Sequence, residues 1–324
     1  MDNIKNEIEM EQDSRGHESI DIFESDTESM DAAVPEVDGT EVDAALDTAA
    51  RIKEKLQRLE KMRDLYTEYL PRHVFEHKID VYHDIIVLFI SDWHLGSVYT
   101  DYQKASEMWD AILGNDRVYV IVDGDMIDNF EVASTKLLQA GISSQLITPA
   151  LQREILMECL NVLKEKGKLL AIVLGNHESF TQQYPFAISC IPVALNRMFL
   201  KLKIGFTEYK IAVVHKSRYN STLNPLHSSQ RELTVLYPDA DVVVSAHTHL
   251  PVVATYPYPH EGRYVDRVLI KLGTIKSDEY TTAYFSHALD FDISPSIVFG
   301  YIDRKMTVFT KLEDAIRFIK RTIW

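Results

Sequence analysis

Cysteine is scarce in this chain, which has only Cys159 and Cys190 among its 324 residues. Two thiols cannot build a dense disulfide framework, so we expect both to be reduced, as in a cytosolic protein. Long apolar runs are also missing, because no stretch approaches the roughly 18 to 20 apolar residues of a membrane-spanning helix. The first residues lack the basic start and apolar core of a signal peptide. These absences predict a cytoplasmic protein that does not enter membranes.

Basic residues are nearly absent from residues 1–50, where 16 Asp and Glu accompany only Lys5 and Arg15. This stretch therefore carries −14 of the net charge of −15, and the other 274 residues are about neutral. Few aromatics and no sustained periodicity predict that residues 1–48 form an acidic disordered tail. A neutral folded part leaves a nucleic-acid substrate open, which a uniformly acidic surface would disfavour.

A helical pattern follows the tail at residues 49–70, where apolar side chains such as Ile52, Leu56 and Leu59 recur at three- and four-residue steps. This spacing predicts an amphipathic helix that ends before Pro71. The helix could pack on its own domain, or residues 51–70 could bind a protein partner or self-associate. Residues 71–324 are expected to form one folded domain.

Short apolar runs alternate with helical patterns from Tyr82 onward, which favours an α/β fold in which helices cover a sheet. Between two of the runs, Thr148 can cap a helix that begins at Pro149 and closes at Gly167. Five apolar runs, at 84–90, 117–122, 168–174, 209–214 and 240–245, end in "SDWH", "DGDMID", "GNHE", "HKS" and "AHTH". Loops beyond the carboxyl ends of strands form the ligand crevice of open α/β sheets, so these polar residues can converge in space.

The candidate ligands are carboxylates, imidazoles and a carboxamide, with no thiolate. This oxygen and nitrogen set suits manganese, iron, zinc or magnesium rather than a closed structural zinc site. Seven ligands are more than one ion takes from a protein, so two ions that share a carboxylate fit better, an arrangement suited to attack at phosphorus. The seven candidates are Asp92, His94, Asp125, Asn176, His215, His247 and His249.

The ordered blocks "DWH", "GDMID", "GNHE", a lone His after a strand and "HTH" resemble the signature of the calcineurin-like metallophosphoesterases. The resemblance covers about residues 83 to 275. Within that superfamily the blocks look closest to the SbcD-like DNA repair exonucleases and to phosphoesterases of bacteriophage genomes. It implies a metallophosphoesterase-type β-sandwich flanked by helices, with metal ligands on loops after strand ends. It also implies a bacterial or phage-infected host cell as the setting.

The resemblance implies a role for each matching residue. Asp92, His94 and His249 would bind one metal, Asn176, His215 and His247 the other, and Asp125 would bridge both. His177 resembles the catalytic histidine of the family, which donates a proton to the leaving oxygen or stabilises phosphoryl charge. Two divalent ions, in the first place manganese, are therefore the expected cofactors.

Three further positions near these blocks carry expectations. Asp128 and Glu178 could orient ligand histidines, or could serve as capping or surface residues. The family's last block usually opens with Gly, whereas this chain has Ala246. A backbone angle that only glycine tolerates at that position would disturb His247.

Two segments are expected to border the crevice: an insert of about 40 residues after Asp128, and the loop between His215 and Asp241. That loop carries Lys216, Arg218 and Arg231 with an aromatic residue, a mixture that could grip a nucleic-acid backbone. Residues 255–264 predict a rim hairpin, and the last residues predict a hairpin and a closing helix.

Three functions remain compatible with the sequence. The first is a two-metal phosphodiesterase acting on nucleic acid, in particular a DNA nuclease or exonuclease. The second is a phosphatase or pyrophosphatase acting on a nucleotide, a lipid-linked pyrophosphate or another small phosphoester. The third is a non-catalytic metal-binding subunit of a replication or virion complex, although an intact His177 and seven intact ligands argue against an idle site.

Overall fold

The computed structural model describes residues 50–61, 74–130, 142–178, 190–221, 223–276 and 294–322. The chain divides into two compact units, Met1–Tyr69 and Leu70–Trp324. In the first unit the structure describes a helix over residues 50–61, which agrees with the start of the helix predicted at 49–70. The acidic tail and residues 62–70 lie outside the described residues, so the predicted domain boundaries stay a prediction.

The first of two six-stranded sheets, named here the β3 sheet, has the strand order β12-β11-β2-β3-β4-β5. β2 to β5 run parallel, whereas β11 is antiparallel to both β2 and β12. Every residue of β2, β3 and β4 is buried, as expected for parallel strands that are covered on both faces. The strands are β2 (Ile85–Ile90), β3 (Val118–Asp123), β4 (Leu169–Leu174), β5 (Val193–Leu195), β11 (Ser296–Phe299) and β12 (Met306–Phe309).

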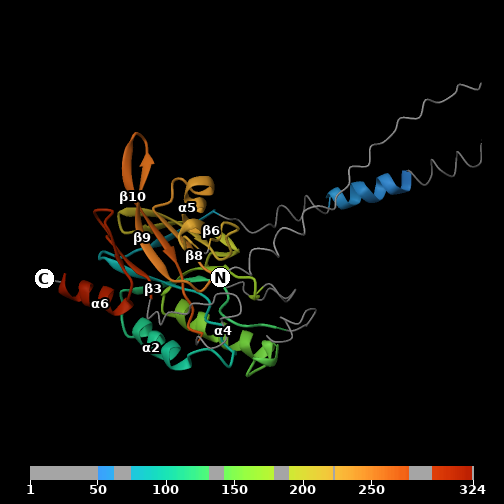
Figure 1. Ribbon diagram of the computed structural model, residues 1–324, viewed down its shortest axis with the longest axis horizontal. Coiled ribbons are helices and arrows are strands. Elements are labelled where there is room, and N and C mark those ends of the chain that lie inside the picture. Colours follow the sequence, from blue (N-terminus) through green and yellow to red (C-terminus); the bar gives the residue numbers. More distant parts are fainter. Residues whose placement is uncertain are drawn as a thin grey trace, which may run out of the picture. The chain divides into compact units, whose positions relative to one another are not determined.

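The second sheet, named the β7 sheet, has the order β1-β6-β7-β8-β10-β9. β7, β8 and β10 run parallel, and β9 and β10 form the predicted rim hairpin, drawn in orange in Figure 1. In β6, buried residues alternate with more exposed ones, the period of a strand with one covered face. The strands are β1 (Val74–Ile79), β6 (Arg197–Ile204), β7 (Thr207–Val214), β8 (Val242–Ser245), β9 (Val252–His260) and β10 (Arg263–Lys271).

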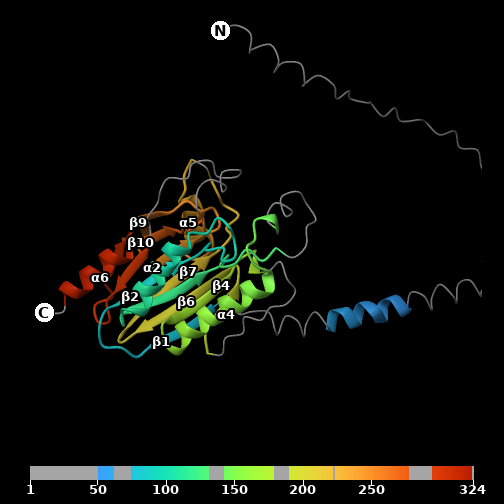
Figure 2. The same cartoon turned by 90° about the horizontal axis from the view of Figure 1, so that it is seen from below.

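Three longer helices, α2 (Tyr102–Leu113), α4 (Pro149–Glu165) and α6 (Leu312–Arg321), cover the outer face of the β3 sheet (Figures 1 and 2). The helix predicted from the Thr148 cap is confirmed, because the Thr148 hydroxyl accepts a hydrogen bond from the N–H of Leu151. The predicted C-terminal hairpin and helix are confirmed as β11, β12 and α6. Among the helices that the structure describes, none is long and apolar enough to cross a membrane.

The outer face of the β7 sheet is covered by two short elements, α5 (His227–Arg231) and the π-helical turn η2 (Glu232–Leu236). Both lie within the loop that was predicted to border the crevice. Leu233 of η2 packs with Ala212 of β7 and Leu269 of β10. The loop is therefore anchored to the sheet rather than extended away from it.

The largest core cluster lies between the two sheets. Phe89 and Val173 of the β3 sheet belong to the same buried cluster as Ile211 and Val244 of the β7 sheet. The predicted α/β sandwich flanked by helices is therefore confirmed. The five strands that end in polar blocks do not form a single open sheet. The strands β2, β3 and β4 lie in the β3 sheet, whereas β7 and β8 lie in the β7 sheet.

Candidate metal centre

The loop after β2 places Asp92 and His94 at the centre of the site. Both side chains are buried, and both residues have a left-handed backbone, with φ of 53° and 48°. The N–H of Asp92 donates to the carbonyl of Gly124, and the N–H of His94 donates to the carbonyl of Asp125. The loops after β2 and β3 are thus joined by main-chain hydrogen bonds, which fix the direction of the Asp92 and His94 side chains.

The loops after β3 and β4 approach each other so closely that both need glycine. A Cβ on Gly124, whose φ is +73°, would lie 2.5 Å from the backbone nitrogen of Gly175, and a Cβ on Gly175 would collide with Asp125 Oδ1. Asn176 lies between Gly175 and His177, whose N–H donates to Asp125 Oδ1 over 2.9 Å. The close backbone contact therefore delivers the "GNHE" block to the Asp125 carboxylate.

Glu178 fastens these two loops together. Its carboxylate accepts hydrogen bonds from the N–H groups of Asp125, Met126 and Gly175, at 2.7 to 2.9 Å. Burial raises the pKa of Glu178, with the Asp125 carboxylate as the second cause. Of the roles left open for Glu178, the structure shows its carboxylate capping backbone N–H groups of the metal loops.

The loops after β7 and β8 supply the three remaining histidines. The N–H of His247 donates to Asp92 Oδ2 over 3.2 Å, and the ring of His215 contacts the carbonyl of Asp123 through Nδ1 at 2.6 Å. His247 and His249 have left-handed backbones, with φ of 71° and 57°. Ala246 is buried and has no positive φ, so the expected conflict at this non-glycine position does not arise.

Six of the seven predicted ligands come together from four loops of two sheets, and the seventh, Asn176, precedes His177 on a fifth loop. His249 Nε2 lies 3.2 Å from Asp92 Oδ1, and His215 Nε2 lies 2.9 Å from Asp125 Oδ2. Three groups have ligand atoms within 4.8 Å of one another, and Asp125 belongs to two of them. The groups are Asp92, His94 and His249; Asp125, His215 and His247; and His94, Asp125 and His177.

The polar atoms of the site fit divalent cations. His94 Nε2 and Asp92 Oδ1 are buried and make no hydrogen bond within the part of the chain that the structure describes. A buried polar atom without a partner costs free energy, about 1–3 kcal/mol, and a bound cation would remove that cost. Carboxylate oxygens and imidazole nitrogens are the ligands that manganese, iron and zinc share.

The titration of the site is also that of a metal centre. Burial, and after it the Lys276 ammonium, lowers the pKa of His94 to about 3, so the ring is neutral at pH 7, as a metal ligand must be. Burial by itself raises the pKa of Asp92, but His249 and His215 outweigh it and bring the pKa to about 2. Burial lowers the pKa of His215, but the Asp125 carboxylate outweighs it and raises the pKa well above its usual value. The Asp125 carboxylate that favours a positive charge on His215 would likewise attract a divalent cation.

Left-handed backbone is concentrated at this site. Five of the seven predicted ligands and Asn129 have φ between 48° and 71°. A left-handed backbone costs a residue other than glycine on the order of 1–2 kcal/mol, although Asn, Asp and His tolerate it better than most. The hydrogen bonds between the loops hold this strain at the point where the side chains must converge. The residues with this backbone are Asp92, His94, Asp125, Asn129, His247 and His249.

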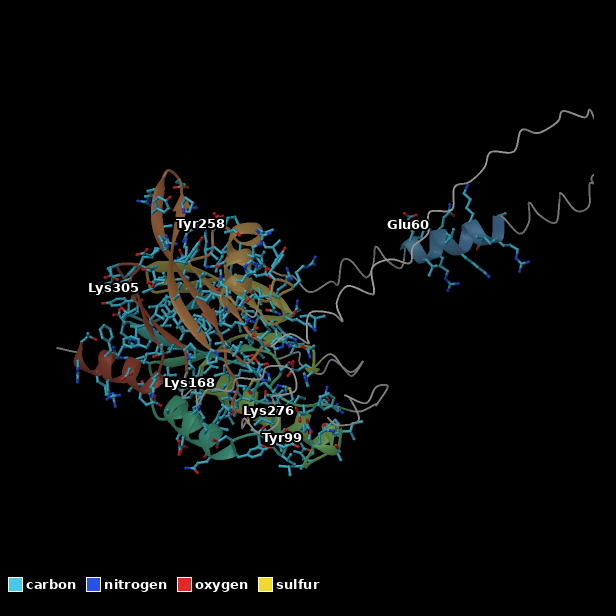
Figure 3. The ribbon with its side chains drawn as sticks, in the orientation of Figure 1. Glu60, Tyr99, Lys168, Tyr258, Lys276 and Lys305 are labelled. Atoms are coloured by element: carbon cyan, nitrogen blue, oxygen red, sulfur yellow. The ribbon has the colours of Figure 1, made fainter. Side chains whose placement is uncertain are left out.

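A sixth loop, which the sequence analysis did not assign to the site, follows β10. The Thr274 hydroxyl donates to the carbonyl of Asp92 over 2.6 Å, and Lys276 Nζ lies 3.0 Å from Asp128 Oδ1. The backbone of Lys276, which is labelled near Tyr99 in Figure 3, also forms an antiparallel β-bridge with Thr100. The signal that could have revealed this loop is that β10, like β8, is an apolar run that ends in small and polar residues. The residues that follow this loop, 277–293, lie outside the described residues.

Asp128 lies where a partner of a ligand histidine was expected. Its Oδ1 atom lies 2.8 Å from Nδ1 of His94, and its side chain is buried. Burial alone raises the pKa of Asp128, but the hydrogen bond with His94 and the charge of Lys276 lower it to about 2. The carboxylate is therefore ionised and can fix the ring and tautomer of His94.

The predicted substrate-binding residues lie on the segment that leads away from His215. Lys216 and Arg218 are exposed. Between them lies the buried Ser217, whose hydroxyl donates a hydrogen bond to Glu232. Arg231 of α5 stacks over the ring of Tyr219, 5.4 Å from its centroid. The structure thus brings these cations to one loop beside the metal ligands, and their contact with a substrate stays a prediction.

Fold and site together define a two-sheet metallophosphoesterase. The sequence profile of the calcineurin-like phosphoesterases matches residues 85–251, just over half of the chain, and the chain belongs to this family. The family is metal-dependent, which agrees with the candidate metal-binding groups. The resemblance to SbcD-like exonucleases stays a prediction.

The solved structures to which the chain is similar are distant in sequence. Vacuolar Protein Sorting 29 from Cryptosporidium parvum is 18% identical, and the match covers 71% of this chain and 100% of that one with a TM-score of 0.36. The calcineurin-like phosphoesterase YfkN from Bacillus subtilis is 9% identical, and the match covers 74% and 97% with a TM-score of 0.33. No curated protein matches the sequence.

Proposed function

We propose that the protein is a two-metal phosphodiesterase that acts on nucleic acid, as a DNA nuclease or exonuclease. The observation that carries the proposal is the convergence of six nitrogen and oxygen ligands, among them Asp92 and Asp125, with His177 beside them. Asp92, His94 and His249 would hold one ion, and Asn176, His215 and His247 the other. Asp125 would touch both ions, because it belongs to two of the ligand groups.

Two divalent ions bound at these residues, manganese in the first place, would act as Lewis acids on the phosphoryl group and lower the pKa of the attacking water. The chain supplies the orientation. Asp128 fixes His94, Thr274 holds the carbonyl of Asp92, and Glu178 joins the loops after β3 and β4.

His177 would donate a proton to the leaving oxygen. Its Nδ1 atom lies 2.7 Å from the carbonyl oxygen of Asp128, which can only accept a hydrogen bond. Nδ1 therefore carries a proton, and Nε2 is the atom that can exchange a proton with the substrate. Nε2 lies 3.9 Å from Asp125 Oδ2, so it reaches the edge of the metal site.

Charge and position support nucleic acid as the substrate. Lys216 and Arg218 follow the ligand His215 directly and are exposed, so they could contact phosphates on either side of the scissile one. Tyr219 and Arg231 form a stacked pair on the same loop. The chain after residue 50 is about neutral, so these cations would not be cancelled by a general negative charge.

The test is a manganese-dependent assay of the whole chain on single-stranded DNA, duplex DNA, RNA, cyclic nucleotides and bis(4-nitrophenyl) phosphate. Asp125→Asn serves as the inactive control. We expect cleavage of one of the polynucleotides and of the chromogenic diester. The double variant Lys216→Ala, Arg218→Ala should lose polynucleotide cleavage while its turnover of the chromogenic diester stays within about twofold.

Two other results would contradict the proposal. Hydrolysis restricted to small phosphoesters, with no polynucleotide cleaved, would move the function to a phosphatase or pyrophosphatase. Metal binding without hydrolysis of any of these esters would favour a non-catalytic subunit.

A further inference from the structure

The residues Asp128, Asn129 and Phe130 surround His177. Beyond the Asp128 contact, the Asn129 carboxamide donates from Nδ2 to the carbonyl oxygen of His177 over 2.7 Å. The Phe130 ring meets the His177 ring edge to face, with centroids 4.9 Å apart and planes at 73°. The His94 ring also meets the His177 ring edge to face, with centroids 4.7 Å apart and planes at 86°. His177 is therefore held through its ring and its main chain.

The main chain of His177 is fixed at both ends by side chains. Its N–H donates to Asp125 Oδ1, and its carbonyl accepts from Asn129. Neither of the two peptide groups that flank His177 can rotate without breaking one of these bonds, to Asp125 or to Asn129. The direction of the His177 Cα–Cβ bond, and thus the reach of Nε2, follows from these two bonds.

Asn129 is buried and is held in place by hydrogen bonds to α4. It is fully buried, and its φ of +51° lies in the left-handed region that Asn, Asp and Gly tolerate. Its N–H donates to Gln152 Oε1 over 2.8 Å, and its Oδ1 accepts from the Arg153 guanidinium over 2.8 Å. Because a guanidinium only donates and a carbonyl only accepts, these two partners fix which end of the carboxamide faces His177.

We propose that Asn129 is a positioning residue, whose carboxamide transmits the rigid first turn of α4, through Gln152 and Arg153, to the proton donor His177. The proposal rests on the proposed role of His177. If Asn129 positions His177, the loss of its one hydrogen-bond donor misaligns Nε2 and slows the protonation of the leaving group. This change to the structure is far smaller than removal of the His177 side chain.

The substitution Asn129→Asp isolates the donor. Aspartate has nearly the same shape, accepts the left-handed backbone and keeps an acceptor for Arg153, but an ionised carboxylate cannot donate to the His177 carbonyl. Asn129→Gly keeps the backbone and removes both groups. The matched control is Asn115→Asp, since Asn115 Oδ1 accepts from the N–H of Arg117 at the far end of β3, a bond that aspartate can also make.

The experiment compares the 4-nitrophenyl and phenyl esters of thymidine 5′-monophosphate in the manganese-loaded protein. Phenolate leaves less readily than 4-nitrophenolate and depends more on a proton donor. We expect Asn129→Asp and Asn129→Gly to lower kcat on the phenyl ester by about 10 to 100-fold, since small misplacements cost factors of that order. The loss on the 4-nitrophenyl ester should be several-fold smaller, with KM and bound metal unchanged. Asn115→Asp should behave as the wild type.

Wild-type kcat of Asn129→Asp on both esters, with His177→Ala inactive, would overturn the proposal. An equal loss on both esters would also overturn it, because general damage to the fold does not depend on the leaving group. If the wild type hydrolyses neither ester, the proposed function fails, and the positioning claim is decided by the imidazole ¹⁵N signals of His177. These signals should shift or broaden in Asn129→Asp, and unchanged signals would overturn the claim.

Discussion

Lys276 Nζ lies 3.0 Å from Oδ1 of Asp128, a residue 148 positions earlier in the chain. The same oxygen lies 2.8 Å from Nδ1 of His94, so one carboxylate contacts both a cation and a ligand imidazole. Asp128 is buried and Lys276 is only slightly exposed, so solvent screens this pair little. The negative charge of Asp128 therefore offsets the positive charge of Lys276 next to the ligand His94.

Asp128→Asn should weaken metal binding by about 10 to 100-fold, the usual range for a residue that orients a ligand histidine. The amide keeps an acceptor for His94, but the carboxylate charge is lost and the Lys276 ammonium then repels the cation. Both effects act in the same direction. The double variant Asp128→Asn, Lys276→Met removes that repulsion and should recover part of the affinity. Calorimetric titration with manganese measures both, and wild-type affinity in Asp128→Asn would contradict the account.

His177→Ala should keep the bound metal and lose on the order of 10² to 10⁴ in turnover, the range for a positioned proton donor. The test separates two readings of the geometry, since His177 also lies in a ligand group with His94 and Asp125. Metal analysis of the purified variant makes the distinction. Loss of an ion in His177→Ala would mean that His177 is a ligand and that another group protonates the leaving oxygen.

Lys271 should make the free energy of unfolding depend on pH in alkaline solution. Its side chain is almost fully buried, with Nζ 3.3 Å from Asn220 Oδ1 and 3.4 Å from the Ser228 hydroxyl. Burial lowers its pKa to about 8, against 10.5 for a free lysine. Between these values the unfolded chain binds more protons than the folded one, so the free energy of unfolding rises with pH, by up to about 1.4 kcal/mol per pH unit. Below pH 8 both states are protonated and this contribution to the slope vanishes.

Denaturant unfolding of the wild type and of Lys271→Met between pH 7 and 10.5 measures this effect. The difference between the two proteins should be constant below about pH 8 and should change steadily above it in favour of the wild type. The exposed Lys203 of the same sheet provides the control, and Lys203→Met should follow the wild type. A difference that does not change with pH would show that Lys271 keeps an ordinary pKa.

The acidic tail should be dispensable for chemistry. Deletion of residues 1–47 removes the whole −14 charge of the first 50 residues and should leave turnover of a small phosphodiester unchanged. If the substrate is nucleic acid, the deletion should tighten binding, most at low salt, where charges are least screened. Equal DNA affinity of the two forms across a salt series would exclude competition between the tail and the substrate.

The ligand residues could be predicted because the signal was repeated. One Asp-x-His after a strand, as at Asp92 and His94, is a common turn, whereas five strand ends with metal-type residues are not. Apolar runs and cap residues were sufficient for the five strands that end in polar blocks and for α4, where Thr148, Pro149 and Gly167 mark the ends, whereas β1, β5 and β6 were not predicted. The division of the strands between two sheets followed from the family resemblance alone, because the residues of β3 and β7 read alike as buried runs.

Other parts of the site could not be predicted because they depend on contacts between distant residues. Lys276 lies on a loop whose sequence carries no ligand, and its role is visible only beside Asp128. Asn129 reads as an ordinary turn residue, and nothing in the sequence shows that its carboxamide reaches His177. The sequence left open whether Glu178 orients a ligand histidine or serves as a capping or surface residue, and the three backbone N–H groups that bind its carboxylate are not revealed by any pattern of side chains.

The most direct test of the central claim is the number of divalent ions per chain, measured by plasma mass spectrometry after dialysis against manganese. The account predicts two ions in the wild type. We also expect a larger loss in Asp125→Ala than in Asp92→Ala or His249→Ala, because Asp125 belongs to two ligand groups, whereas Asp92 and His249 each belong to one. One tightly held ion in the wild type, unaffected by Asp125→Ala, would contradict the two-metal site.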